Sequence, residues 1–133
     1  MSQKPRSFHL VSEQMKAWSS ALADEVATWP QVEARSFFGF TALYRQQKIF
    51  GLLPRTRALH AANCIAFKIE NPSPAVRKRL DSCSQLGSME MHKARWFLYP
   101  LSSGADLHAA LDWLGLAYDA AGRNWPMRRK FRS

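Results

Sequence analysis

Histidine, cysteine and carboxylate side chains are the groups that would carry metal binding or nucleophilic catalysis. The four histidines are scattered, and no two have the spacing of paired metal ligands. Of the two isolated cysteines, Cys64 could act as a nucleophile with a distant histidine as base. Its apolar surroundings favour instead a small buried side chain. We therefore expect no metal site, no thiol catalysis and no cofactor.

A second polar group lies near the end of the chain. His108, Asp112 and Asp119 are spaced by four and seven residues and would share one face of a helix. The opposite face of that helix carries an apolar stripe, which predicts that the three residues face solvent and form no carboxylate site. The sequence also has no glycine-rich or serine motif with phosphate-binding spacing. The sequence thus predicts a protein that is not an enzyme.

The strongest functional candidate is the basic segment 123–133. The formal net charge is +9, and this segment holds five cations and no acid, whereas residues 11–122 hold twelve basic and ten acidic side chains. Its cations would meet phosphates, and unpaired bases could stack on its two aromatic rings. The candidate nucleic-acid-binding residues are Arg123, Trp125, Arg128, Arg129, Lys130, Phe131 and Arg132. Two other interpretations stay open, a solubilising terminus and a tail that folds back over Asp112 and Asp119.

Arginines elsewhere in the chain could extend this basic surface. Arg55 and Arg57 follow one apolar run, and Arg77 to Arg79 lie in a segment with helical spacing. A continuous positive face would favour nucleic acid as the partner, whereas a convergent polar pocket would favour a small ligand.

Apolar patterns predict the elements that carry these groups. A helix is predicted over residues 13–28, after a cap at Ser12 and with one apolar stripe from Met15 to Val26. Two further helices are predicted, from a cap at Ser73 with Pro74 in the first turn, and from a cap at Ser103 to Gly122. Two aromatic-rich runs, 34–44 and 48–53, predict a hairpin. Residues 63–69 predict a strand with one well-buried face, residues 95–99 another, and a short strand is expected around Met89. The order α-β-β-β-α-β(β)-α predicts a two-layer α+β fold, an antiparallel sheet of four to five strands packed by helices.

The length of 133 residues predicts one domain, with a core at about residues 11–122 and the basic tail at 123–133. Large side chains in apolar patterns should be buried, namely Phe38, Phe67, Trp96 and Leu111. The N-terminus lacks the apolar run of a signal peptide, and no segment approaches the ~20 apolar residues that span a bilayer. Isolated cysteines suit a reducing compartment. We expect a cytoplasmic protein that does not associate with membranes.

The hairpin also resembles a known family. Phe38-Gly39-Phe40-Thr41-Ala42-Leu43-Tyr44, followed by Lys48-Ile49-Phe50-Gly51, is similar to the first hairpin of the TfoX N-terminal-like family. Ala66-Phe67-Lys68 resembles its third strand, and the segment from Met91 to Trp96 with Pro100, Asp106, Leu107, Trp113 and Ala120-Ala121 resembles its C-terminal strand and helix. The resemblance covers roughly residues 14–122. Phe40 and Arg95 replace a customary glycine and tyrosine, as in a remote member, and the related YjbR-like family shares the layout.

This resemblance implies a two-layer α+β fold. It also implies a link to competence regulation, although the biochemical activity of the family is not settled. We therefore expect a non-enzymatic regulatory domain that acts by binding, with nucleic acid or a regulatory protein as its partner. Two alternatives stay open. The first is a small-ligand binder or enzyme that uses the exposed face of the sheet, and the second is a dimerisation module.

Overall fold

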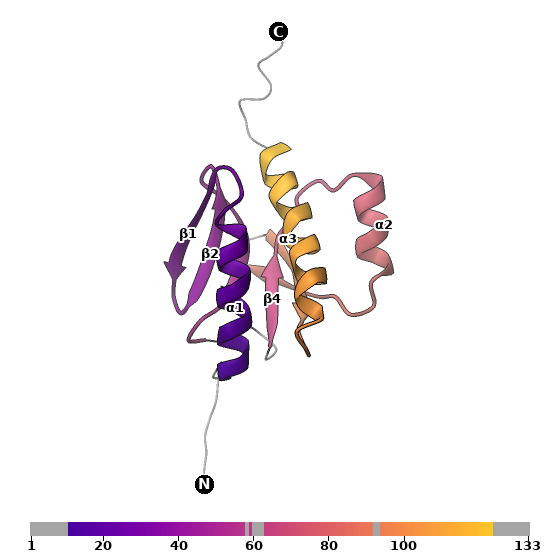
Figure 1. Ribbon diagram of the computed structural model, residues 1–133. Coiled ribbons are helices and arrows are strands. Elements are labelled where there is room, and N and C mark those ends of the chain that lie inside the picture. Colours follow the sequence, from indigo (N-terminus) through magenta and orange to yellow (C-terminus); the bar gives the residue numbers. More distant parts are fainter. Residues whose placement is uncertain (1–10, 58, 60–62, 92–93, 124–133) are drawn as a thin grey trace.

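The computed structural model describes residues 11–57, 59, 63–91 and 94–123. These residues form an α+β fold of three helices and six strands in the order α-β-β-β-β-α-β-β-α (Figure 1). The helices are α1 (Glu13–Val26), α2 (Pro74–Ser82) and α3 (Asp106–Arg123). The strands are β1 (Val32–Phe37), β2 (Phe40–Arg45), β3 (Lys48–Pro54), β4 (Cys64–Phe67), β5 (Gly87–Met91) and β6 (Ala94–Pro100).

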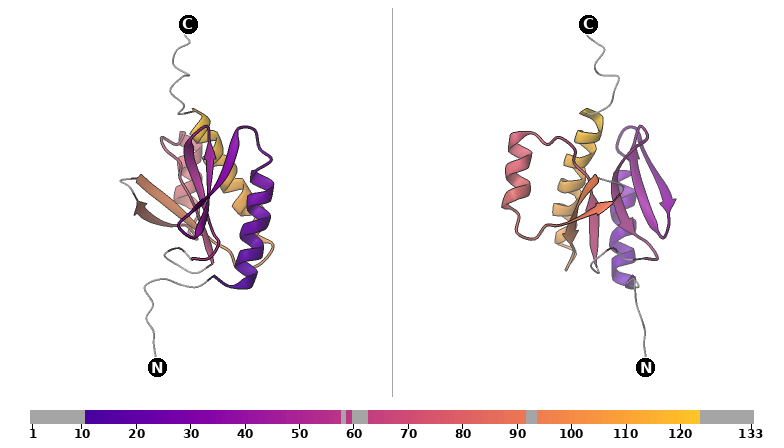
Figure 2. Two further views of the ribbon diagram at one scale, coloured as in Figure 1. Left: turned by 90° about the vertical axis from the view of Figure 1, so that its left-hand side faces the viewer. Right: turned by 180° about the vertical axis from the view of Figure 1, so that it is seen from behind.

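All six strands join one antiparallel sheet in the order β1-β2-β3-β4-β6-β5. The described helices lie on one side of it, and the view from behind shows the strands with no helix in front of them (Figure 2). α1 and α3 cross the central strands, whereas α2 stands beside α3 toward the β5–β6 edge (Figures 1 and 2). The predicted two-layer architecture is confirmed. No helix among the described residues is long and apolar enough to cross a bilayer.

The sheet has more strands than predicted because the predicted strand 34–44 is in fact two strands. Phe37 pairs with Phe40 across a turn whose two central residues, Phe38 and Gly39, have φ angles of 49° and 90°. Positive φ at both positions is what a two-residue type I′ hairpin turn requires. The turn reverses the chain, so β1 lies at the edge of the sheet and β2 lies inside it.

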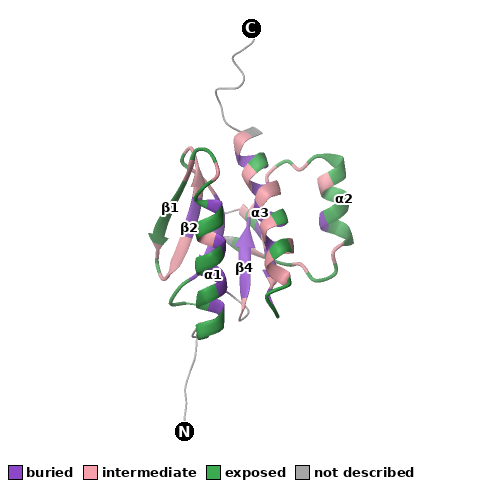
Figure 3. Ribbon diagram, in the orientation of Figure 1, coloured by how far each residue is buried: buried purple, intermediate pink, exposed green. Residues whose placement is uncertain are grey.

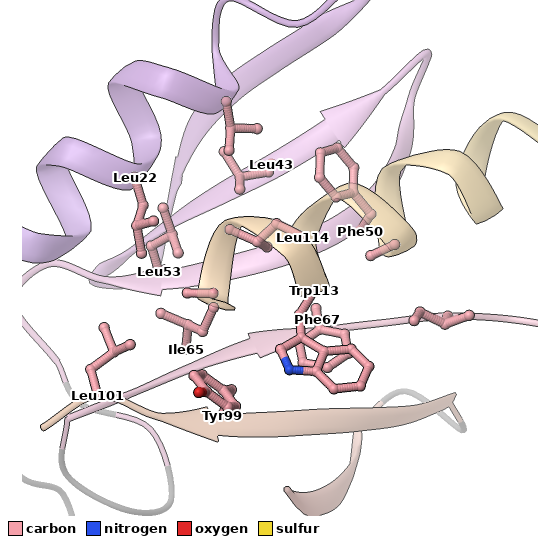
Figure 4. Close-up of a cluster of buried hydrophobic side chains, with 14 of the residues drawn as sticks. Leu22, Leu43, Phe50, Leu53, Ile65, Phe67, Tyr99, Leu101, Trp113 and Leu114 are labelled. Carbon is pink, nitrogen blue, oxygen red and sulfur yellow. The ribbon is translucent and has the colours of Figure 1, made fainter. Parts of the chain in front are cut away.

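The main hydrophobic core lies between the helices and the sheet (Figure 4). Phe67 of β4 is fully buried, and its ring stacks on Trp113 of α3 and Phe97 of β6, with ring centroids 5.4 and 5.6 Å away. α1 contributes one stripe, Met15, Trp18, Leu22 and Val26, all buried as its spacing predicts. Figure 3 shows this stripe turned toward the sheet and the exposed residues of α1 turned outward.

A second cluster occupies the helix-free side of the sheet. Its buried members are Ala42, Leu52, Leu59, Cys64, Ala66, Trp96 and Leu98. The sequence predicts one well-buried face for β4, yet all four of its residues are buried, because the strand is central and apolar side chains cover both of its faces. Cys64 is therefore a small buried core residue, as predicted. Burial of Trp96 is also confirmed, whereas Leu111 is only half-buried.

Local capping signals fix the starts of the helices. The Ser12 hydroxyl accepts from the Met15 amide at 3.1 Å, and the Ser73 hydroxyl accepts from the Val76 amide at 3.2 Å. The cap predicted at Ser103 is not observed, because α3 begins at Asp106. There the Asp106 carboxylate accepts from the amides of Ser102 and Ser103, at 2.6 and 3.1 Å. A carboxylate in the first turn also complements the helix dipole.

Arg45, at the end of β2, holds the C-terminal part of α3 against the sheet. Its Nη1 donates to the Tyr118 carbonyl oxygen at 3.0 Å, and its guanidinium lies 4.1 Å from the centroid of the Tyr118 ring. The Tyr118 hydroxyl in turn donates to the Pro30 carbonyl at 2.8 Å. We call these three residues the Arg45 clasp.

A small pH dependence should follow from Glu70, which pairs with Lys48 at 3.1 Å and Lys68 at 3.4 Å. Burial raises the pKa of its carboxyl, but the hydrogen bond from Lys48 and the charges of both lysines outweigh that effect, so its pKa is lowered. A lowered folded-state pKa contributes stability above the unfolded value, and this contribution is lost as the pH falls through the folded value.

We expect Glu70→Gln to lower the unfolding free energy at neutral pH by less than ~1 kcal/mol, since the pair is partly exposed. The difference from wild type should disappear once the pH is well below the usual glutamate pKa of about 4.3. Urea melts across this pH range are the measurement, with the exposed Glu25→Gln as control. A deficit that stays constant down to low pH would contradict the assignment.

Candidate nucleic-acid interface

The sequence-predicted basic tail lies almost wholly outside the described residues. Arg123 is the last residue of α3, and the other six candidate residues (Trp125, Arg128, Arg129, Lys130, Phe131 and Arg132) lie beyond it. The alternative in which the tail folds over Asp112 and Asp119 therefore stays a prediction. Both acids and His108 are exposed on α3, as their spacing predicts. The described residues hold no group of three or more potential metal ligands.

The arginines that could extend the tail do not share one face. The Arg55 guanidinium donates to the Ser36 hydroxyl at the β1 edge, at 2.8 Å. Arg79 instead lies over Trp113 of α3, 5.2 Å from the ring centroid, and Arg77 lines a hollow beside β5 and β6. The two groups therefore sit at opposite edges of the sheet. Among the described residues, only the group near β1 adjoins an exposed aromatic side chain, that of Phe38, which stands beside Phe37 and Phe40.

Those aromatic residues form what we call the aromatic turn, residues 37–40. Phe38 is 76% exposed and is the only large hydrophobic residue so exposed among those described. Its ring meets that of Phe37 edge to face, with centroids 4.9 Å apart, and Phe37 and Phe40 are each half-buried. The apolar context of Phe38 predicts burial, and that prediction is wrong because the residue is at the tip of a turn.

The segment after β3 wraps around this turn and brings cations to it. The backbone amides of Arg55, Thr56 and Arg57 all donate to the Gly39 carbonyl oxygen, at 3.0, 2.9 and 3.2 Å. A Cβ at Gly39 would lie 2.7 Å from the Arg57 side chain, so the close approach needs glycine. At Phe38, by contrast, a bulky side chain occupies a position with positive φ, a conformation that is uncommon and costly for such residues. Strain of this kind, retained at an exposed aromatic residue, is typical of functional sites.

Charge near the aromatic turn is predominantly positive. Arg35 lies on the same side of β1 as Phe37, two residues away, and its guanidinium is 4.5 Å from the centroid of the Tyr44 ring. Glu33 accepts from Arg35 at 3.0 Å, and this hydrogen bond lowers the pKa of Glu33, so the pair stays ionised at neutral pH. Together with Arg55 and Arg57, which follow β3 and donate to Gly39, three arginines adjoin the turn.

Two hollows were not foreseen from the sequence. One, of about 380 Å³, lies beside the aromatic turn between α1 and the segment after β3. The other, of about 410 Å³, lies between α2 and the β5–β6 hairpin and includes Arg77, Arg95 and Asp81. The first draws its side chains from α1, β2 and the segment after β3, which are far apart in the sequence. The second lies between consecutive elements and depends on how α2 packs beside the hairpin, so no local pattern signals either hollow.

The fold and the site together define an α+β domain with an exposed aromatic and basic surface at one edge of its sheet. No protein-family model, curated protein or solved structure matches this chain. The resemblance to the TfoX N-terminal-like family therefore stays a prediction from the sequence.

Proposed function

We propose that this protein is a non-enzymatic, cytoplasmic binding domain, resembling the TfoX N-terminal domain, that contacts single-stranded nucleic acid. The observation that carries the proposal is Phe38, a strained and 76% exposed aromatic residue beside three arginines. Proteins that bind single strands combine aromatic side chains, on which bases stack, with cations that neutralise the backbone. The aromatic turn and its arginines supply both.

A single strand suits this surface better than a duplex. A base in a duplex is already stacked on both sides, whereas an unpaired base can stack on an exposed ring. The ring of Phe38 is accessible, and the edge-to-face contact with Phe37 holds it in place. The basic tail, 123–133, would add a second, sequence-independent contact to phosphates.

A regulatory protein is the competing partner, because phenylalanine-rich and arginine-rich patches also occur at protein interfaces. The charge around the aromatic turn favours the polyanion. Three arginines adjoin it, and Glu33 on β1 is paired with one of them, Arg35. The chain as a whole carries a formal charge of +9.

The test is a fluorescence anisotropy titration of labelled single- and double-stranded oligonucleotides at about 50 and about 200 mM salt. Phe38→Ala should weaken single-strand binding about tenfold or more, since stacking is worth about 1–3 kcal/mol per base. The dependence of affinity on salt should stay as in wild type, because the variant keeps every cation. Lys78→Gln, an exposed change on α2, is the control.

A second variant, with the five tail cations changed to glutamine, separates the tail from the turn. It should flatten the salt dependence, by about 0.7 in slope for each phosphate that the tail no longer neutralises. A full-length protein that binds no single strand at low salt would contradict the proposed function. Unchanged binding by Phe38→Ala would remove the aromatic turn from the interface.

A further inference from the structure

The hollow beside the aromatic turn has the chemistry of an anion site. Its lining includes four hydroxyl side chains and two cations, from Lys16, Ser19, Ser20, Thr41, Arg55 and Thr56. None of the described residues that line it carries a carboxylate. Its volume of about 380 Å³ is at the lower end of the range for small-molecule sites, about 300–1,000 Å³. We call it the hydroxyl pocket.

Ser19 distinguishes this pocket from an ordinary surface depression. Of the described lining residues it alone is buried, with 3% of its surface exposed, and so it forms the floor. Its hydroxyl has no hydrogen-bond partner among the described residues. A serine within a helix can donate to the carbonyl one turn earlier, and a buried hydroxyl that makes no bond lowers stability. The Ser19 hydroxyl makes no such bond with the described residues, so its donor is unused at the base of the pocket.

The cations of the pocket also have charge and hydrogen-bond donors that a ligand could use. Among the described residues the Arg55 guanidinium makes one hydrogen bond, to Ser36, although its planar fork carries five donors. Lys16 pairs with Glu13 at 3.3 Å, but the glutamate side chain is 91% exposed and the pair is weak for that reason. Arginine, lysine and hydroxyl donors around one cavity match the tetrahedral oxygens of a phosphate group.

The other hollow fits such a ligand less well. Asp81 stands in its lining with Arg77 and Arg95, so a carboxylate offsets part of the positive charge and would repel an oxyanion.

We infer that the hydroxyl pocket binds a phosphate group, supplied either by a mononucleotide or by the phosphorylated end of a nucleic-acid strand. Arg55 and Lys16 provide the charge, and Ser19 donates from the floor. This inference goes beyond the proposed function, because it requires no stacking on Phe38. It places a phosphate near the aromatic turn, because Thr41 and Thr56 line the pocket and adjoin that turn.

The first experiment titrates the full-length protein with inorganic phosphate at constant ionic strength and follows backbone amide shifts by NMR. Saturable shifts are expected at Lys16, Ser19, Thr41 and Thr56. Arg55→Gln should weaken binding about tenfold or more, since it removes a charge-assisted hydrogen bond. Lys78→Gln changes charge by the same amount on α2 and should leave the affinity unchanged.

Ser19→Ala gives the sharper result. It should weaken phosphate binding several-fold while leaving the melting temperature equal to or above that of wild type, because a buried hydroxyl without a partner is removed. A Ser19→Ala protein with full phosphate affinity, or phosphate shifts that match those from chloride, would overturn the inference.

The source of the phosphate is distinguished by two further arms. Adenosine monophosphate against adenosine tests the mononucleotide, and 5′-phosphorylated against 5′-hydroxyl oligonucleotide tests the strand end. Tighter binding of the phosphorylated ligand in either arm, absent in Arg55→Gln, supports the pocket and identifies its ligand. Phosphate binding that survives while single-strand binding fails would keep this inference and remove the proposed function; the reverse outcome would do the opposite.

Discussion

Replacing Phe67 with alanine should lower the unfolding free energy by about 3–5 kcal/mol, whereas the same replacement at Phe38 should cost less than about 1 kcal/mol. Phe67 is fully buried and stacks on Trp113 and Phe97, so truncation loses transfer free energy and leaves a cavity. Phe38 is 76% exposed and stands at a positive φ that alanine tolerates no worse.

Urea melts followed by tryptophan fluorescence measure both changes on the same scale. The two variants remove the same atoms, so their difference reports the environments of the rings and not the chemistry of the substitution. A decrease below about 1 kcal/mol at Phe67 would show that β4 is not the central strand of the core. A decrease of several kcal/mol at Phe38 would mean that the aromatic turn packs onto the domain.

Replacing Arg45 with methionine should cost about 2 kcal/mol, the second-largest effect expected on stability. The substitution keeps the aliphatic stem but removes the charged hydrogen bond to the Tyr118 carbonyl and the stacking on the Tyr118 ring. A cation near the C-terminal end of α3 also favours the helix dipole.

Arg45→Lys is the informative companion, because it keeps the charge without the planar fork. We expect it to restore less than half of the lost stability in the same melts. Full restoration would show that charge alone holds α3, and an unchanged midpoint in Arg45→Met would show that the Arg45 clasp contributes nothing. Arg35→Met, at an exposed pair with Glu33, should leave the midpoint almost unchanged.

The sequence predicts most of the fold because its strongest signals are local. The stripe from Met15 to Val26 and the caps at Ser12 and Ser73 act within a turn or two of the chain, and each appears in the structure as expected. The short strand around Met89 also forms, as β5. Each of these features depends on neighbours within a few residues, so periodicity and capping chemistry suffice.

The wrong strand count and the wrong prediction for Phe38 come from unusual turn chemistry. Two-residue hairpin turns with positive φ favour asparagine, aspartate and glycine, yet this chain uses Phe38-Gly39 in one turn and Gln46-Gln47 in the next. The first turn therefore resembles the interior of a strand, which hides β1 and wrongly predicts burial of Phe38. A local rule broken without visible compensation is also what draws attention to the aromatic turn as a functional site.

The candidate site could not be predicted from local sequence patterns, for a different reason. The hydroxyl pocket joins one face of α1 to residues after β3. These segments meet because β1 pairs with β2 and β2 pairs with β3 in the folded sheet. The unsatisfied Ser19 hydroxyl likewise results from packing. Serine occurs at many positions in helices, so its presence in the sequence does not reveal whether its hydroxyl lacks a partner. Basic residues near β1 and in the tail could be counted from the sequence, but their common surface could not be derived from it.

The position of α3 in the chain order has a consequence for biosynthesis. Pairing of β1, β2 and β3 connects neighbouring segments and can form early on the ribosome. The part of its helix-facing side that α1 does not cover stays exposed until α3 emerges, because Trp113, Leu114 and Ala117 complete the core there. Until then the nascent chain exposes apolar residues such as Phe50 and Phe67. Ribosome stalling before α3 would thus leave an aggregation-prone species and a substrate for chaperones.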